Sequence, residues 1–133
     1  MTSRRLIRIK VLQLLYAYYK KEGASLAEAE RDLLKSIEKS TDLYYQILLL
    51  LSELQRKAFL KIDAAKNRHF VTEADLHPNT RFIGNPVFSI LNNNKKFRTY
   101  LLNNPISWNE NQEIINFFYN TLQEFPPYQA YME

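Results

Sequence analysis

Apolar positions recur at helical spacing along most of the chain, and they predict an all-α protein built as a helical bundle. The first run, residues 4–21, contains no proline or glycine. At about 100° per residue its apolar side chains form two neighbouring stripes. One stripe is Ile7, Val11, Leu14 and Tyr18, and the other is Leu12, Leu15, Tyr16 and Tyr19. Two adjacent stripes predict a central helix that other helices contact from more than one side.

Capping signals divide the next apolar runs into two further helices. Gly23 closes the first helix, and Ser25-Leu26-Ala27-Glu28 is a capping box that begins a second helix over about residues 26–39. The cluster Ser40-Thr41-Asp42 predicts another start, followed by a long helix to about Arg68. Its inward stripe is expected at Leu43, Ile47, Leu50, Leu54, Ala58 and Ile62. The pattern predicts an N-terminal three-helix unit over residues 1–68.

Residues 69–133 lack a long periodic run and are expected to form a loop followed by short helices. Asn85-Pro86 begins one short helix, and Asn103-Asn104-Pro105 interrupts the chain after it. The last predicted helix covers residues 110–125 and ends at Pro126-Pro127. Its packing face is expected to contain Ile114, Phe117, Phe118, Leu122 and Phe125.

Composition excludes several kinds of chemistry. The chain has 133 residues and no cysteine, so it has no disulfide, thiol nucleophile or cysteine zinc site. Its two histidines, His69 and His77, are not at a helical metal-binding spacing, and its two glycines form no phosphate loop. We expect no enzyme activity, cofactor or metal. The longest uncharged apolar stretch outside the first helix, residues 47–51, is far below the ~20 residues that span a bilayer, so a soluble protein is expected. The absence of cysteine fits the reducing cytoplasm, which is the expected location.

Positive charge is concentrated at the N-terminus. Residues 1–21 contain six basic and no acidic residues, so against a total of +4 the other 112 residues sum to −2. Arg4, Arg5 and Arg8 lie along one side of the predicted helix, and Lys10 is turned away. Cations at a helix N-terminus oppose the macrodipole, at about 0.3–1 kcal/mol each, so helix propensity does not explain them. A phosphate partner would, although a solvated tip or arginine stems packed over the core are alternatives.

The motif Arg4-Arg5-x-x-Arg8 followed by Val11-Leu12-Gln13-x-Leu15-Tyr16 resembles the opening helix of the NusB family of bacterial transcription antitermination factors. The resemblance covers residues 1 to about 68. Helical motifs typical of the C-terminal half of that family do not occur, so we expect the N-terminal portion of a long variant, with residues 69–133 as a helical insertion and the C-terminal subdomain missing. Gln13 and Tyr16 match the family pattern, and Tyr16 is expected to belong mainly to the core.

The resemblance implies a function. It implies binding of single-stranded boxA-type RNA in ribosomal transcripts, together with NusE, a small-subunit ribosomal protein, within the antitermination complex of RNA polymerase. Phosphate contacts would come from Arg4, Arg5 and Arg8, with Lys10 contributing to the field. The alternative is a helical protein–protein interaction domain without specific RNA binding. A salt titration separates them, since RNA binding weakens with a slope of about −0.7 per phosphate contacted.

A second basic cluster, Lys95, Lys96 and Arg98, alternates with Phe97 and Tyr100. Such a pattern could bind a nucleic-acid strand by phosphate contact and base stacking. Alternatively, the aromatic rings pack inward while the cations face water. We favour this second interpretation, because no family pattern supports the first.

Overall fold

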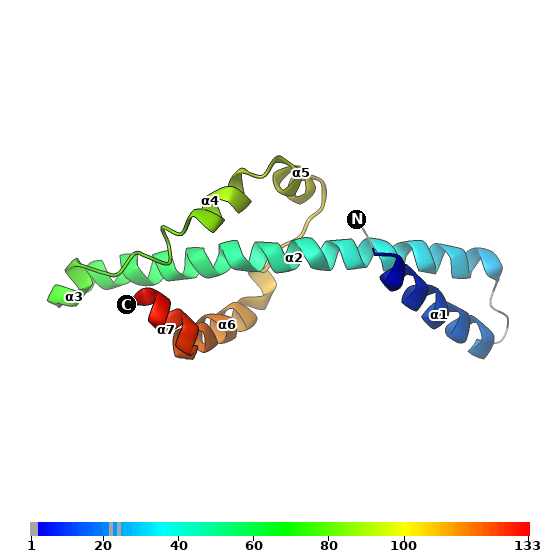
Figure 1. The fold of residues 1–133 in the computed structure, drawn as a ribbon, viewed down its shortest axis with the longest axis horizontal. Helices are drawn as coiled ribbons and strands as arrows, with labels where there is room; N and C mark the ends of the chain where they lie inside the picture. The colour runs from blue at the N-terminus through cyan, green and yellow to red at the C-terminus, as the bar shows by residue number, and fades with distance from the viewer. Residues whose placement is uncertain (1–2, 22, 24) are drawn as a thin grey trace. The chain divides into compact units, whose positions relative to one another are not determined.

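The computed structural model describes residues 3–21, 23 and 25–133, and every regular element in them is a helix (Figure 1). This confirms the predicted all-α fold. The helices are α1 (Arg4–Lys20), α2 (Leu26–Lys66), α3 (Glu73–Leu76), α4 (Pro86–Asn93), α5 (Lys95–Asn103), the short 3-10 helix η1 (Asn109–Asn111), α6 (Gln112–Glu124) and α7 (Pro126–Met132).

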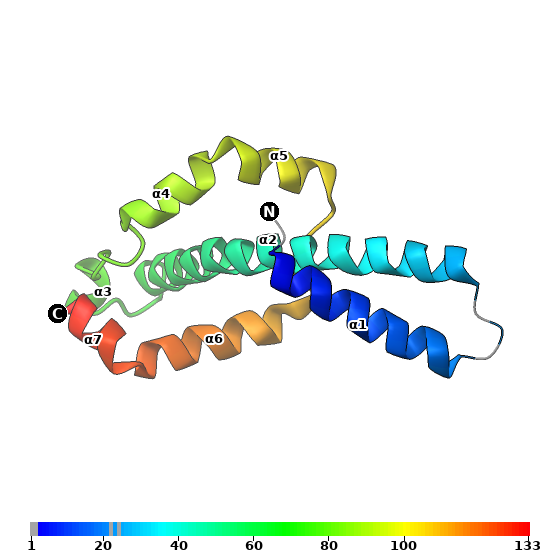
Figure 2. The same cartoon turned by 45° about the vertical axis from the view of Figure 1, so that its right-hand side comes forward.

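The chain forms two compact units, residues 1–44 and residues 45–133. The first unit contains α1 and the beginning of α2, which run in opposite directions around the turn at Gly23 (Figures 1 and 2). The second unit contains the rest of α2 and all later helices. The division at residue 68, expected from the helix pattern and the family resemblance, stays a prediction.

The predicted caps at Ser25 and Asn85 are confirmed. The first helix does not end at Gly23 as predicted, because Lys21 is its C-cap and the Lys21 N–H donates to the carbonyl oxygens of Ala17 and Tyr18. Gly23 lies in the turn that follows and has φ 75°, the left-handed conformation that favours glycine. The Glu28 N–H donates to Ser25 Oγ (3.2 Å), and the Ser25 N–H donates to Glu28 Oε2 (3.5 Å), which completes the capping box. The Asn85 side chain accepts from the Val87 N–H (2.9 Å) before Pro86 in the first turn of α4.

The predicted helix start at Ser40-Thr41-Asp42 is wrong, because α2 runs through it without interruption. Hydroxyl groups of Ser40 and Thr41 donate one turn back along the helix, to the carbonyl oxygens of Ser36 (2.9 Å) and Ile37 (3.5 Å). Serine and threonine can make such bonds inside a helix, although they are more common at its N-cap. With no proline or glycine nearby, the helix has no reason to end.

Replacing Thr41 with alanine therefore tests the continuity of α2. We expect the free energy of unfolding to stay constant or rise by a few tenths of a kcal/mol, because alanine has the higher helix propensity. Ser25→Ala, which removes an observed N-cap, is the control and should cost about 1 kcal/mol. Urea unfolding followed by far-UV circular dichroism measures both. An equal loss in the two variants would show that Thr41 is a cap.

The second unit has a small core in which α6 packs on α2. Ile115 (1% exposed) and Tyr119 from α6 meet Leu54 and Ala58 from α2, all four buried. Burial raises the pKa of the Tyr119 phenol, since the charged form loses hydration. The side chains packed against this cluster are Leu50, Phe82, Ile83 and Trp108.

The packing face predicted for the last helix is wrong at four of its five positions. Phe117 is 65% exposed, and Ile114, Phe118 and Phe125 are also exposed, whereas Leu122 is half-buried. The buried positions are Ile115 and Tyr119. The segment before α6 is fixed by Trp108, whose Nε1–H donates to the Gln46 carbonyl of α2 (2.9 Å). We attribute the choice of face to this anchor.

Helix α7 begins at the two prolines that end α6, because proline is tolerated in the first turn of a helix. The Tyr131 hydroxyl donates to the Arg81 carbonyl (3.1 Å) and accepts from the Asn85 amide (3.0 Å), which ties α7 to the preceding loop. At the start of α3, hydrogen bonds from the N-cap residue Thr72 hold the pKa of the Asp75 carboxyl below its usual value. Among the described residues, no helix has the length and apolar character needed to cross a membrane.

Candidate nucleic-acid interface

The four residues predicted to bind RNA all lie in the first two turns of α1. Ser3 caps this helix, and its Oγ accepts from the Leu6 N–H (3.2 Å). The first turn contains no acidic residue. The positive charge of Arg4 and Arg5 is therefore added to the positive end of the helix dipole, with nothing in this turn to offset it.

Three of the four cations share one side of α1 and are exposed. In helical projection Arg8 lies about 40° from Arg4, and Arg5 about 60° beyond Arg8. Lys10 lies on the opposite side, where it is half-buried, whereas Arg4, Arg5 and Arg8 are exposed. The structure thus groups the three arginines and separates Lys10 from them.

The side chains of the three arginines have no interaction partner in the part of the chain that the structure describes. Within that part the one ion pair joins Arg56 to Glu53 (2.7 Å). No described residue forms a hydrogen bond, ion pair or ring contact with the side chain of Arg4, Arg5 or Arg8. Their five N–H donors each are therefore available to an external acceptor.

The prediction that other helices contact α1 from more than one side is wrong, because no residue of α1 is buried. In the first stripe Val11, Leu14 and Tyr18 are half-buried, and Ile7 is exposed. The second stripe is exposed: Leu12 by 70%, Leu15 by 45%, Tyr16 by 68% and Tyr19 by 82%. Tyr16 was expected in the core, and instead its ring faces solvent with Lys20 Nζ 5.9 Å from its centroid. A hydrophobic pattern identifies a stripe but not whether anything covers it.

The exposed stripe lies on the same side of α1 as the arginines. In projection Leu15 and Tyr19 lie about 20° and 60° from Arg4, and Tyr16 about 120° from it. Basic and aromatic side chains therefore form one continuous strip, about 22 Å long at 1.5 Å per residue. We call it the arginine–tyrosine face, and it consists of Arg4, Arg5, Arg8, Leu12, Leu15, Tyr16 and Tyr19.

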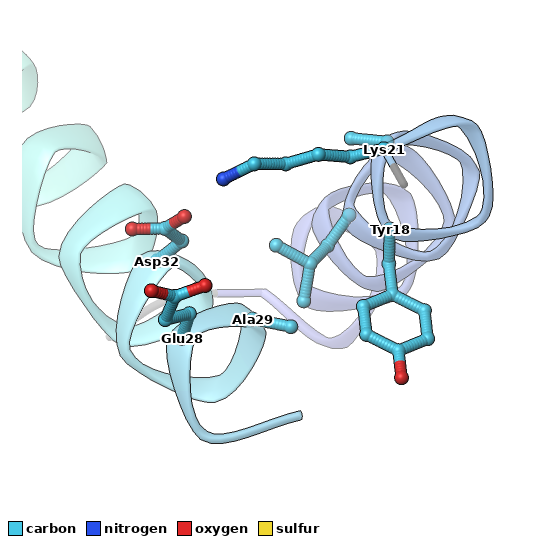
Figure 3. A pocket seen from close by; sticks show the side chains of 7 residues that line it. Tyr18, Lys21, Glu28, Ala29 and Asp32 are labelled. Carbon is cyan, nitrogen blue, oxygen red and sulfur yellow. The ribbon is translucent and has the colours of Figure 1, made fainter. Parts of the chain in front are cut away.

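The opposite side of α1 faces α2 at the turn, as Figure 3 shows. A small cavity of about 60 Å³ lies there between Leu14, Ala17 and Tyr18 of α1 and residues 28, 29 and 32 of α2. The Lys21 side chain extends toward the carboxylates of Glu28 and Asp32 (Figure 3). This cation is directed at the chain's own acidic groups, unlike the three arginines.

Comparison of the chain with protein-family models, curated proteins and solved structures finds no match. The chemistry of the arginine–tyrosine face and the motif in α1 therefore indicate the function. Guanidinium groups bind phosphate oxygens in bidentate fashion, and exposed tyrosine rings stack on bases. The arginine–tyrosine face offers both groups on one side of α1, with the arginines in its first two turns and the tyrosines nearer its end. Sequence reasoning found its arginines but assigned its tyrosines and leucines to the core.

Proposed function

We propose that the chain binds single-stranded RNA through the arginine–tyrosine face. The observation that carries this proposal is the exposure of Arg4, Arg5 and Arg8 on one side of α1, without a partner among the described residues. Arginines at a helix N-terminus are unfavourable for the free protein and become favourable once a phosphate is bound. An RNA strand supplies such phosphates at regular intervals.

The exposed rings favour a single strand over a duplex. Bases of single-stranded RNA can be unstacked and accessible, and they then stack on aromatic side chains. Tyr16 and Tyr19 lie two to three helical turns beyond Arg8 and are the candidates for this contact. Lys10, on the other side of α1, contributes to the local potential without touching the strand.

The finer part of the proposal follows the NusB resemblance. On that basis the RNA is a boxA-type sequence in ribosomal transcripts, the protein partner is NusE, and the assembly modifies RNA polymerase so that it reads through terminators. A cytoplasmic location belongs to the same proposal. Support for it comes from the α1 motif, whose arginines are exposed as a phosphate-binding role requires.

Fluorescence anisotropy with labelled RNA tests this function. We expect a boxA-type RNA to bind about tenfold more tightly than a scrambled RNA of equal length and composition, with affinity for both falling steeply as salt rises. Equal affinity for the two RNAs would reject the antitermination proposal and leave unspecific RNA binding. Affinity that does not change between low and high salt would reject phosphate recognition altogether.

A protein-binding function is the second candidate, and the uncovered stripe on α1 favours it. Exposed apolar patches with polar neighbours are typical of protein interaction sites. In that case Leu12, Leu15, Tyr16 and Tyr19 would pack against a partner helix, and the arginines would contact acidic residues at its edge. Replacing Leu12 with serine distinguishes the two, because it should impair protein binding strongly and RNA binding little.

A further inference from the structure

We propose that the second unit contains a separate nucleotide-binding pocket beside α5. The pocket has a volume of about 360 Å³ and lies between α5 and Tyr45 of α2. That volume is in the range of about 300–1,000 Å³ typical of small-molecule sites. From α5 and the residue after it, the pocket is lined by Lys95, Lys96, Thr99, Tyr100, Asn103 and Asn104.

The charged side chains that line the pocket are all positive, which favours a negatively charged ligand. Its lining contains two lysines and no acidic residue. Both lysines are exposed, and no described residue forms an ion pair with either of them. They occupy the first turn of α5, which contains no acid, so the helix dipole adds to their positive potential. By contrast, the cavity at the turn of the first unit contains two carboxylates.

The wall of the pocket is aromatic and rigid. The rings of Tyr45 and Tyr100 stack with centroids 3.6 Å apart and planes 14° from parallel. Phe97 lies on Tyr45 at 6.2 Å and 22°, and it is only 4% exposed, so the ring group is anchored in the interior. A flat ligand in the pocket would meet a preformed flat surface.

The far end of the pocket is neutral and polar. The Asn104 amide donates to the Tyr100 carbonyl (2.9 Å), which fixes its side chain, and Asn103 is exposed beside it. Side-chain amides offer both donors and acceptors, as the edge of a nucleobase requires. Cations at one end, stacked rings in the wall and amides at the other end match a phosphate, a base plane and a base edge. This combination indicates a nucleotide.

The pocket also resolves the two interpretations of the basic cluster. Phe97 packs inward, which confirms the packing interpretation for that ring and removes it from any stacking role. The three cations are exposed, as the packing interpretation also predicts. The half-buried Tyr100 ring stacks on Tyr45, which lies 55 positions earlier in the chain. No local sequence pattern predicts the contact between Tyr45 and Tyr100. Of the three cations, Arg98 does not line the pocket.

Nuclear magnetic resonance on the full chain tests the pocket, with adenosine 5′-monophosphate as the probe. We expect the nucleotide to shift the side-chain amide signals of Asn103 and Asn104. In Lys95→Ala/Lys96→Ala its affinity should fall about tenfold or more. The control Lys66→Ala/Arg98→Ala removes the same charge from the same unit outside the pocket and should leave the affinity unchanged. Trp108 fluorescence confirms that each variant is folded.

Three results would overturn the assignment. These are no shift at millimolar nucleotide, an equal loss in the two double variants, or a response to inorganic phosphate as strong as that to the nucleotide. The test is independent of RNA binding by α1. Arg4→Ala/Arg5→Ala/Arg8→Ala should retain the nucleotide response even if it no longer binds RNA, and the nucleotide response should persist if the proposed antitermination function fails.

Discussion

Replacing Arg4, Arg5 and Arg8 together with alanine is expected to weaken binding of boxA-type RNA about 100-fold at moderate salt. Each exposed arginine that contacts a phosphate contributes on the order of 1 kcal/mol, and about 1.4 kcal/mol corresponds to a factor of ten. The slope of log K against log salt should become shallower by about 2, because three contacts of about 0.7 each are lost. Anisotropy titrations over a salt series measure both quantities.

A matched control separates local recognition from net charge. Arg31, Lys35 and Lys39 are exposed at four-residue spacing on the part of α2 that belongs to the same unit. Their replacement by alanine lowers the net charge from +4 to +1, as the α1 variant does. We expect a much smaller loss of RNA affinity. If both triple variants lose the same affinity and slope, the RNA responds only to overall charge, and α1 is not its site.

Arginine chemistry is separated from charge by a third variant, in which the same α1 residues become lysine. This variant retains the charge, so its salt slope should stay near that of the wild type. Its affinity should still fall, because an ammonium group does not form the bidentate contact that a guanidinium group makes with phosphate. Unchanged affinity would mean that the arginines act only as point charges.

Local signals in the sequence predicted the start of α2 and of α4 correctly. Ser25 and Asn85 act through bonds to backbone groups two or three residues away, so their neighbours decide the outcome. Thr41 shows the limit of such signals. The same hydroxyl that caps a helix also bonds to a carbonyl one turn back, and the choice depends on whether the preceding residues are already helical.

Contacts between residues that are far apart in the chain could not be predicted from the sequence. Both stripes of α1 are rich in apolar residues, yet only one faces α2, and Tyr16 belongs to the other. The arginines could be placed on one side of a helix from their spacing alone. Their spacing does not predict whether an acidic residue from a distant part of the chain forms an ion pair with them. The pocket beside α5 depends on Tyr45 reaching Tyr100, which is likewise a tertiary contact.

In α6 too, the face that is buried depends on tertiary contacts. Substitution of Ile115 tests which face this is. Ile115 is 1% exposed within the core of the second unit. Replacing it with alanine is expected to cost about 2–5 kcal/mol, from lost burial and from the cavity left behind. With m values of about 1–3 kcal/mol per molar urea, the midpoint should fall by about 1–2 M. The single tryptophan, Trp108, packs on this core and reports its unfolding by fluorescence.

Phe117→Ala is the control, because it removes a larger side chain from the same helix. Phe117 is 65% exposed, and surface substitutions of this kind usually change stability by no more than about 0.5 kcal/mol. The hydrophobic pattern alone places Phe117 inward and predicts the reverse order of the two effects. A larger loss for Phe117→Ala than for Ile115→Ala would therefore mean that α6 packs with the face read from the sequence. The opposite order would show that the face containing Ile115 is the one buried against α2.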